Sequence, residues 1–316
     1  MSALLDLAQA AVEAAQAAGA DFCDAFCSDL TEISADVENN SINNCSTIRD
    51  QGLSVRAFSR GGKGFASVQQ HDLASARDCA ERAVAMAKAA HPDPDFVALP
   101  APMPFARVPD LFDDKLAGLG ADAFVNWCAR GIEEARAVAD DAVVQGGAGV
   151  DWGASALASS TGIAVEREVS SASLYFYVII NRDGDVGSFY EFDQARLLAD
   201  LEPAGIATKA AHGALDQLGS RPMPTARVPV ILGPLAATSL IGSVIGAADA
   251  ESVQRNRSYL AGREGQPISS EALTVREEPH LPAGMRSTAS DGEGVATLPR
   301  ALIDAGVLTT YLHDSY

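Results

Sequence analysis

Two stretches near the start of the chain repeat their apolar residues with the period of an α-helix. In the first, the apolar positions from Leu4 to Ala15 fall on one helical face, and Gly19 is placed to end the helix with a left-handed cap. In the second, the same period runs from 73 to 87 and stops at the Pro-containing residues 91–94. The sequence therefore predicts two helices that flank the residues between them.

The residues between these helices alternate polar and apolar side chains in short runs typical of strands. Residues 21–69 predict about four strands, with breaks at the Asn-rich residues 39–44 and at a turn over 60–63. Cys23 and Cys27 lie four positions apart on one predicted strand, so they share a face and are expected to be buried thiols rather than ligands. The first part of the chain is thus expected to fold as helix, strands and helix.

A Pro-rich stretch without periodicity, 92–110, is typical of an extended linker. After it the same order returns, with a helix near 122–140, strands over 142–192 and a helix over about 194–218. The repetition lies in the order of elements, because no residue identity between the two parts is visible. It predicts an internal duplication of architecture.

These elements predict an α+β protein with two domains. The N-terminal domain, 1–226, is expected to hold two duplicated helix/β-meander/helix units, at about 1–91 and 120–219. The C-terminal domain, 227–316, begins where the composition changes again.

The C-terminal domain is expected to be mostly β. Val-Pro-Val-Ile-Leu-Gly-Pro at 228–234 is a short buried-strand pattern, and it runs into an apolar helix over 235–248. Alternating segments follow, and a strand pattern is still running when the chain reaches Tyr316. We therefore expect this domain to be incomplete, with exposed apolar surface that a second chain would cover.

The charge of the chain excludes some classes of partner. It carries 23 Lys and Arg against 42 Asp and Glu, a formal charge of −19, which repels nucleic acid and anionic lipid. Residues 227–316 hold only 7 basic and 10 acidic residues, so association with another chain is expected to use this near-neutral part.

The cysteines and the apolar segments indicate the compartment. The five cysteines include no Cys-x-x-Cys pair, which favours reduced thiols in the cytoplasm. The acidic N-terminus does not resemble a signal peptide, and no apolar stretch approaches the roughly 20 residues that span a bilayer. No membrane contact is expected.

Most motifs that carry chemistry are absent from the sequence. No two of the five histidines have the helical spacing of a zinc site. The segment that begins at Asn181 resembles the start of a calcium loop, but Val186 and Phe192 stand where that loop needs glycine and glutamate. The sequence contains neither a phosphate-binding glycine loop nor a nucleophile elbow. It therefore shows no paired nucleophile and base that would support a serine or carboxylate hydrolase.

One charged loop, near 276–293, is the best candidate for a binding site. Its setting is rich in Pro and Gly, as binding loops often are, although such loops are also common as solvent-facing connections. The candidate residues for binding a peptide or a partner are Arg276, His280, Arg286, Asp291 and Glu293.

Four segments of the C-terminal part resemble the TldD/PmbA family, once called modulators of DNA gyrase, and most closely its PmbA (TldE) branch. These are VPVILGP, SLIGSVIGAA, NRSYLAGREGQPI and the long run from Leu273 to Leu312. The sister TldD branch carries His-Glu-x-x-x-His on the helix after the VPV-type strand, for zinc binding and general base catalysis. The resemblance places that motif at 242, 243 and 247, where this chain has Gly242, Ser243 and Ala247.

The resemblance implies a non-catalytic PmbA/TldE-like subunit of a cytosolic TldD/TldE-type metallopeptidase complex that acts on unfolded peptides. It implies no cofactor and no metal held by this chain, and either a TldD-like partner or a homodimer. The alternative is a stand-alone protein-binding regulator of the DNA gyrase type. A co-expressed chain with His-Glu-x-x-x-His would favour the subunit, and a complex with gyrase in the absence of that chain would favour the regulator.

Overall fold

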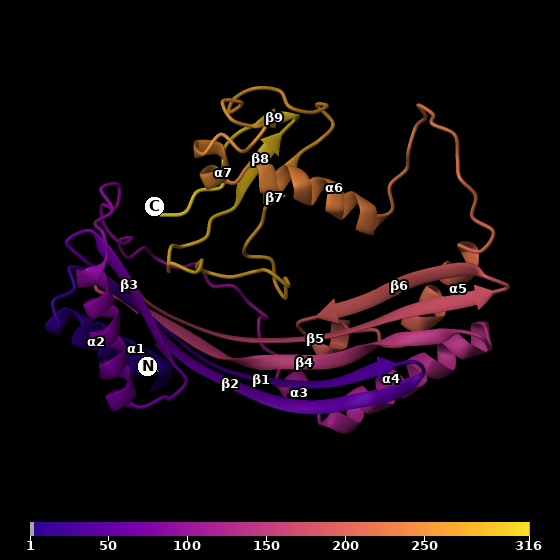
Figure 1. Ribbon diagram of the computed structural model, residues 1–316, viewed down its shortest axis with the longest axis horizontal. Coiled ribbons are helices and arrows are strands. Elements are labelled where there is room, and N and C mark those ends of the chain that lie inside the picture. The colour runs from indigo at the N-terminus through magenta and orange to yellow at the C-terminus, as the bar shows by residue number, and fades with distance from the viewer. Residues whose placement is uncertain (1–2, 316) are drawn as a thin grey trace.

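The first repeat of the chain folds as a helix, three antiparallel strands and a second helix (Figure 1). The computed structural model describes residues 3–315. Three strands replace the four expected, because the first two are 17 and 19 residues long. Only Asn39 and Asn40 form the turn between them, both with the positive φ that a two-residue hairpin turn requires. The elements are α1 (Ala3–Ala17), β1 (Phe22–Glu38), β2 (Ser41–Ser59), β3 (Gly62–Val68) and α2 (Leu73–Ala89).

The second repeat has the same order of elements. Its strands turn at residues 160–163 and 183–184. The closing helix begins at Ile206 rather than near 194, because residues 185–195 stay paired with the preceding strand. The elements are α3 (Asp114–Ala117), α4 (Ala121–Val138), β4 (Val143–Ser159), β5 (Ala164–Arg182), β6 (Asp185–Ala195), the 3₁₀ helix η1 (Leu198–Asp200) and α5 (Ile206–Asp216).

The strands β1 and β4 join the two repeats into one antiparallel sheet of six strands. They pair from Asp24 opposite Ser159 to Val37 opposite Gly146, which gives the order β3-β2-β1-β4-β5-β6. Side chains alternate along a strand, and every buried residue of β1 is odd-numbered. The helices α1, α2, α4 and α5 cover that face. Figure 1 shows the other face, called the open face below, curving toward the C-terminal region.

The core divides into two clusters, one beneath the helices of each repeat. Cys23 and Cys27 are both buried in the first cluster, so the prediction that they share a buried face is confirmed. The second cluster is centred on Phe124 and Phe176, which are fully buried. Together with the sheet, these layers confirm the α+β class.

The extended segment between the repeats forms no helix or strand over residues 90–113, as the Pro-rich sequence predicted. It still packs on the sheet. Phe96 stacks on Phe58 with ring centroids 3.8 Å apart, and the carbonyl of Leu111 accepts a hydrogen bond from the Ser170 amide. The segment therefore lies along both repeats rather than in solvent.

The C-terminal region contains less regular structure than expected. The predicted strand at 228–234 is wrong, because no strand among residues 3–315 pairs with it, and Ile231 is 99% exposed. The three strands present have only two to five residues each, and the expected strand end at Tyr316 lies outside the described residues. The elements are α6 (Pro234–Ala247), α7 (Ala250–Gln254), β7 (Val275–Glu277), β8 (Arg300–Asp304) and β9 (Val307–Leu308).

A small apolar cluster, which includes Leu260, Ile303 and Leu308, holds this region together. The predicted apolar helix is confirmed as α6, but none of its residues is fully buried. Within residues 3–315, no helix is both long and apolar enough to cross a membrane.

Candidate functional site

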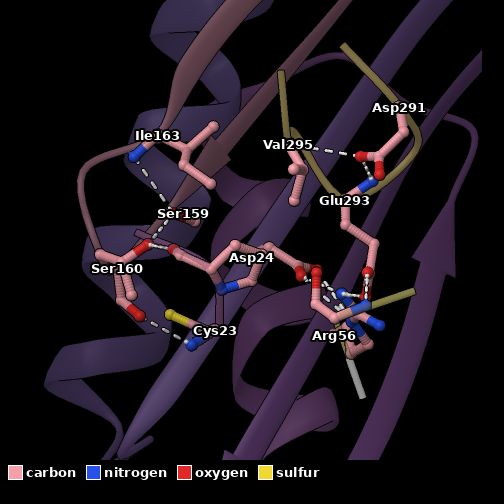
Figure 2. Close-up of polar contacts among 12 residues, drawn as sticks. Cys23, Asp24, Arg56, Ser159, Ser160, Ile163, Asp291, Glu293 and Val295 are labelled. Atoms are coloured by element: carbon pink, nitrogen blue, oxygen red, sulfur yellow. Dashed lines mark hydrogen bonds and ion pairs between the residues drawn. The ribbon is translucent and has the colours of Figure 1, made fainter. Parts of the chain in front are cut away.

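A cluster of ionised side chains joins the open face of the sheet to the C-terminal region (Figure 2). Asp24 on β1 stands opposite Arg56 on β2, and both are even-numbered residues of the open face. The Arg56 guanidinium donates to Asp24 Oδ2 from Nε at 3.0 Å and from Nη2 at 2.6 Å. The same Nη2 lies 3.5 Å from Glu293 Oε1. One arginine thus bridges two carboxylates that are far apart in sequence.

The two carboxyl groups of this cluster have pKa values shifted in opposite directions. Burial raises the pKa of Asp24, although the hydrogen bonds from Arg56 oppose that rise. Burial also disfavours the ionised form of Glu293, but hydrogen bonds from Ser315 and the charge of Arg56 outweigh it and lower the pKa. Arg56 therefore acts on both carboxyl groups: it opposes the rise in the pKa of Asp24 and contributes to the fall in the pKa of Glu293.

The loop that carries Glu293 is shaped by Asp291. Its Oδ1 accepts hydrogen bonds from the backbone amides of Glu293 and Val295, each at 2.9 Å (Figure 2). Gly294, with φ of +79°, lies so close to Ile163 that an added Cβ would meet its side chain at 2.6 Å. A turn in the left-handed region with this little space requires glycine.

A second arginine holds the C-terminal region to the second repeat. Arg196 follows β6 and is 9% exposed. It donates to the carbonyls of Gly284 at 3.3 Å, Met285 at 2.8 Å and Ser170 at 3.1 Å. Burial lowers the pKa of Arg196, because removal from water disfavours the charged guanidinium. Its contacts are structural and place the loop after residue 283.

The C-terminal region also borders a cavity of about 470 Å³. It is lined by the extended segment 106–112, by residues 165–168 of β5 and by the loop residues 288–290. Both Arg107 and Arg167 contribute to the lining, together with two glutamates. The cavity is polar and mixed in charge.

The structure brings together only part of the predicted binding set. Asp291 and Glu293 meet at the junction, as described above. His280 Nε2 lies 3.1 Å from Thr297 Oγ1, whereas Arg276 is paired with Glu278 at 2.9 Å on an exposed strand. Arg286 is exposed. The five residues therefore do not form one constellation.

Asp24, Arg56 and Arg196 were missed by the sequence reasoning. Asp24 and Arg56 are 32 positions apart, and only the register of β1 against β2 places them opposite each other. The one available signal for Asp24 and Arg56 was the alternation of side chains along a strand, which places each of them on the polar face of its own strand. Nothing in the sequence distinguishes Arg196 from a surface arginine.

The helix α6 carries positions 242, 243 and 247, where the resemblance places the zinc motif of the TldD branch. Gly242 and Ser243 are exposed, and the Ser243 hydroxyl donates to the Leu240 carbonyl at 2.7 Å. Glycine and alanine supply no donor atom, and a single hydroxyl that is already bonded to backbone is a poor zinc ligand. Across residues 3–315 no group of three or more His, Cys, Asp or Glu side chains is arranged to hold a metal ion. The donor set does not fit zinc.

Three family models match consecutive parts of the chain. They are PmbA/TldA metallopeptidase domain 1 over residues 23–87, the central domain over 114–218 and the C-terminal domain over 225–316. The chain belongs to the PmbA/TldD metallopeptidase family. This membership confirms the resemblance carried by the C-terminal segments.

Curated members of the PmbA/TldD family resemble the chain along most of its length. The metalloprotease PmbA of Escherichia coli O157:H7 is 29% identical over 293 residues, which cover 92% of this chain and 65% of that protein. The PmbA homologue of Haemophilus influenzae is 27% identical and covers 97% and 68%. The chain thus spans about two thirds of the length of these relatives.

Two solved structures share the fold of this chain. TldE from Thermococcus kodakarensis superimposes with a TM-score of 0.90 at 27% identity, over 99% of this chain and 70% of that one. A protein from Bacteroides thetaiotaomicron described as a putative modulator of DNA gyrase gives 0.87 at 24% identity, over 98% and 71%. At that identity the second match bears on the fold alone.

Proposed function

We propose that this chain is the subunit without a zinc site in a PmbA/TldD-type metallopeptidase complex that cleaves unfolded peptides. In this proposal a TldD-like partner supplies the metal and the general base. The observation that carries it is the donor set of α6, where Gly242, Ser243 and Ala247 occupy the positions of the expected motif. The likeness to a protein named TldE supports the same assignment.

Exposed apolar residues of the C-terminal region support association with another chain. Val230 and Ile231 are 69% and 99% exposed, and Leu240 on α6 is 55% exposed. Side chains this large and this exposed would be covered if the region formed an interface with another chain. A TldD-like chain is the proposed partner, and a second copy of this chain is the alternative.

The thiols are consistent with a cytoplasmic complex. All five cysteines are free, and four of them are buried. Free thiols persist in a reducing compartment, which supports the cytoplasm as the place where the complex acts.

Co-purification with a TldD-like chain that carries His-Glu-x-x-x-His tests the proposal. The isolated chain is expected to hold no stoichiometric zinc and to leave unfolded peptide uncleaved, whereas the pair cleaves it and a chelator stops the reaction. A partner with Gln in place of its motif Glu should abolish cleavage, while Ser243→Ala in this chain should leave it unchanged. Chelator-sensitive cleavage by the isolated chain would contradict the proposal.

The second candidate function is a stand-alone regulator of the DNA gyrase type. Two structural neighbours, at 24% and 22% identity, are described as putative modulators of DNA gyrase, but at these identities their likeness supports the fold rather than the role. A stable complex of this chain with gyrase in the absence of any TldD-like chain would support it. Binding to the TldD-like chain alone would instead favour the peptidase subunit.

A further inference from the structure

The open face of the sheet carries a groove of about 490 Å³ that takes no part in the ionised cluster. It lies over the middle of β1, β2, β4 and β5. Gly147 and Gly149 on β4 fall on the open face, opposite Asp36 and Ser34, and leave its floor without side chains. The groove therefore exposes strand backbone between taller side chains on both sides.

Apolar side chains on the walls of this groove face solvent. Leu30, Ile48 and Tyr175 are 38%, 53% and 51% exposed. Beyond Tyr175 the row continues on β6 with Phe192, its direct partner, and Tyr190, whose ring stacks on that of Phe192. An apolar row of this length on an otherwise polar face is a surface that another molecule can cover.

Carboxylates alternate with these apolar residues. Asp50 is the cross-strand partner of Leu30, and Glu32 is the partner of Ile48. Directly opposite residues have Cβ atoms about 5 Å apart, so each of these carboxylates adjoins an aliphatic side chain. The groove is lined by four acidic residues and no basic one, namely Glu32, Asp36, Asp50 and Asp151.

These four carboxylates differ from Asp24 and Asp29 on β1, each of which is paired with an arginine. Asp29, on the helix-covered face, is paired with Arg49 at 2.6 Å. Among the described residues none of the four groove carboxylates is in an ion pair. Asp151 accepts a hydrogen bond from Ser171 and interacts electrostatically with Arg196, whose own hydrogen bonds go to carbonyls. The groove thus has a negative field without a cation inside it.

We propose that this groove binds an extended, unfolded peptide whose groove-facing side chains alternate between basic and apolar. An extended segment presents every second side chain to one surface, about 6.6 Å apart. Carboxylates and apolar residues follow each other at the same two-residue spacing along the sheet, as Leu30 and Glu32 do on β1 and Ile48 and Asp50 on β2. Charge complementarity selects this occupant, because nucleic acid and a second copy of this chain, at −19, are both repelled. The inference rests on the proposed function, whose substrate class it names.

Binding of short labelled peptides to the full chain, without a partner, tests the groove. One peptide carries Lys and Leu alternately at every second position, with Ser between them, and its control has Glu in place of Lys. The double variant Glu32→Gln/Asp50→Asn and the variant Tyr175→Ala remove the two kinds of contact. A matched control, Glu81→Gln/Glu133→Gln, removes two exposed charges from helices on the other face.

The basic peptide is expected to bind and the acidic one to be rejected. The groove double variant should weaken binding by roughly tenfold, since each exposed ion pair contributes up to about 1 kcal/mol, and added salt should weaken it further. Tyr175→Ala should weaken binding as well, whereas the control double variant should match the wild type.

Absence of binding, equal binding of both peptides, or equal losses in the two double variants would overturn the inference. Equal losses would mean that overall charge attracts the peptide. If the basic peptide binds as expected but a TldD-like chain adds no cleavage, the proposed function fails and the groove stands. If the pair cleaves peptide while groove variants bind it like the wild type, only this inference fails.

Discussion

The two repeats share one order of elements but fill their cores with different side chains. In the first repeat the buried cluster is mostly Ala and Cys, and among the described residues it contains no aromatic side chain. In the second, Phe124 and Phe176 are fully buried, and Gly131 on α4 makes room for the Phe176 ring. The same topology is therefore stabilised in one repeat by close approach of small residues and in the other by large side chains that interlock.

One contact is nevertheless the same in both repeats. The edge strand of each carries a glycine against the backbone of the closing helix. A Cβ added to Gly64 on β3 would meet the Ala83 carbonyl oxygen at 2.0 Å, and one added to Gly187 on β6 would meet that of Ala214 at the same distance. The duplication thus extends to how the last helix of each repeat sits on its outer strand.

The largest effect should come from truncation of an aromatic ring in the second core. Phe176→Ala is expected to lower the free energy of unfolding by about 3–5 kcal/mol, because it leaves a large cavity against Gly131. Val55→Ala in the first core removes two methyl groups and should cost roughly 2 kcal/mol. Urea unfolding of both variants measures the difference. Equal losses would show that the two cores do not differ in this way.

Replacing Arg56 and replacing Arg196, the two arginines that bind the C-terminal region, should have different effects on stability, because they leave different partner groups unpaired. Arg56→Met leaves the mostly buried Asp24 without its cation and should cost about 3 kcal/mol. Arg196→Met leaves neutral carbonyls and should cost less, about 1–2 kcal/mol.

Adding Asp24→Leu to Arg56→Met should recover part of the first loss, because the uncompensated carboxylate is then gone. Thermal unfolding at neutral pH checks all three proteins. A double variant no more stable than Arg56→Met would show that the buried charge is not the cause.

The shared glycine contact predicts equal losses in the two repeats. Gly64→Ala and Gly187→Ala should each lower stability by about 1–3 kcal/mol, because the closing helix must move away from its strand. Gly52→Ala is the control, since its Cβ would meet only Ser28 Oγ, at 3.8 Å. Denaturant midpoints of the three variants test this. A loss in only one repeat would show that the contact is not equivalent.

The buried thiols predict a smaller effect, at alkaline pH. Burial raises the pKa of Cys23 to about 11 and of Cys27 to about 12, from an ordinary 9.0. The folded chain holds these protons more tightly than the unfolded chain does, so their stabilisation is complete below pH 9 and declines as the pH rises toward 11 or 12.

Cys27→Ala should make the decline between pH 9 and 11 shallower by at most about 2 kcal/mol, whereas Cys45→Ala, at an exposed thiol, should leave it unchanged. Stability curves across this pH range distinguish the two variants. If both follow the wild type, the decline has another source.

The periodicity of the sequence predicted the order of elements in the two repeats, because a helix or a strand with one buried face must repeat its apolar residues every 3.6 or 2 positions. It also predicted the extended segment 92–110 and the turn at 60–63. It could not predict that Asn39 and Asn40 alone form the first hairpin turn, since long strands and short ones carry the same local pattern.

Pattern alone failed where a partner decides the structure. Residues 228–232 read as a buried strand, but a strand exists only when another strand accepts and donates its backbone hydrogen bonds, and none of the described residues does so there. The domain boundary at 226 stays a prediction.

The family and the altered α6 positions were determined by the sequence itself, because they depend on which residues stand at fixed spacings. The junction of Asp24, Arg56 and Glu293 and the acidic groove around Glu32 and Asp50 were decided only by the tertiary structure. Each joins residues from separate strands or loops, and their distance depends on strand register and sheet curvature rather than on any local pattern.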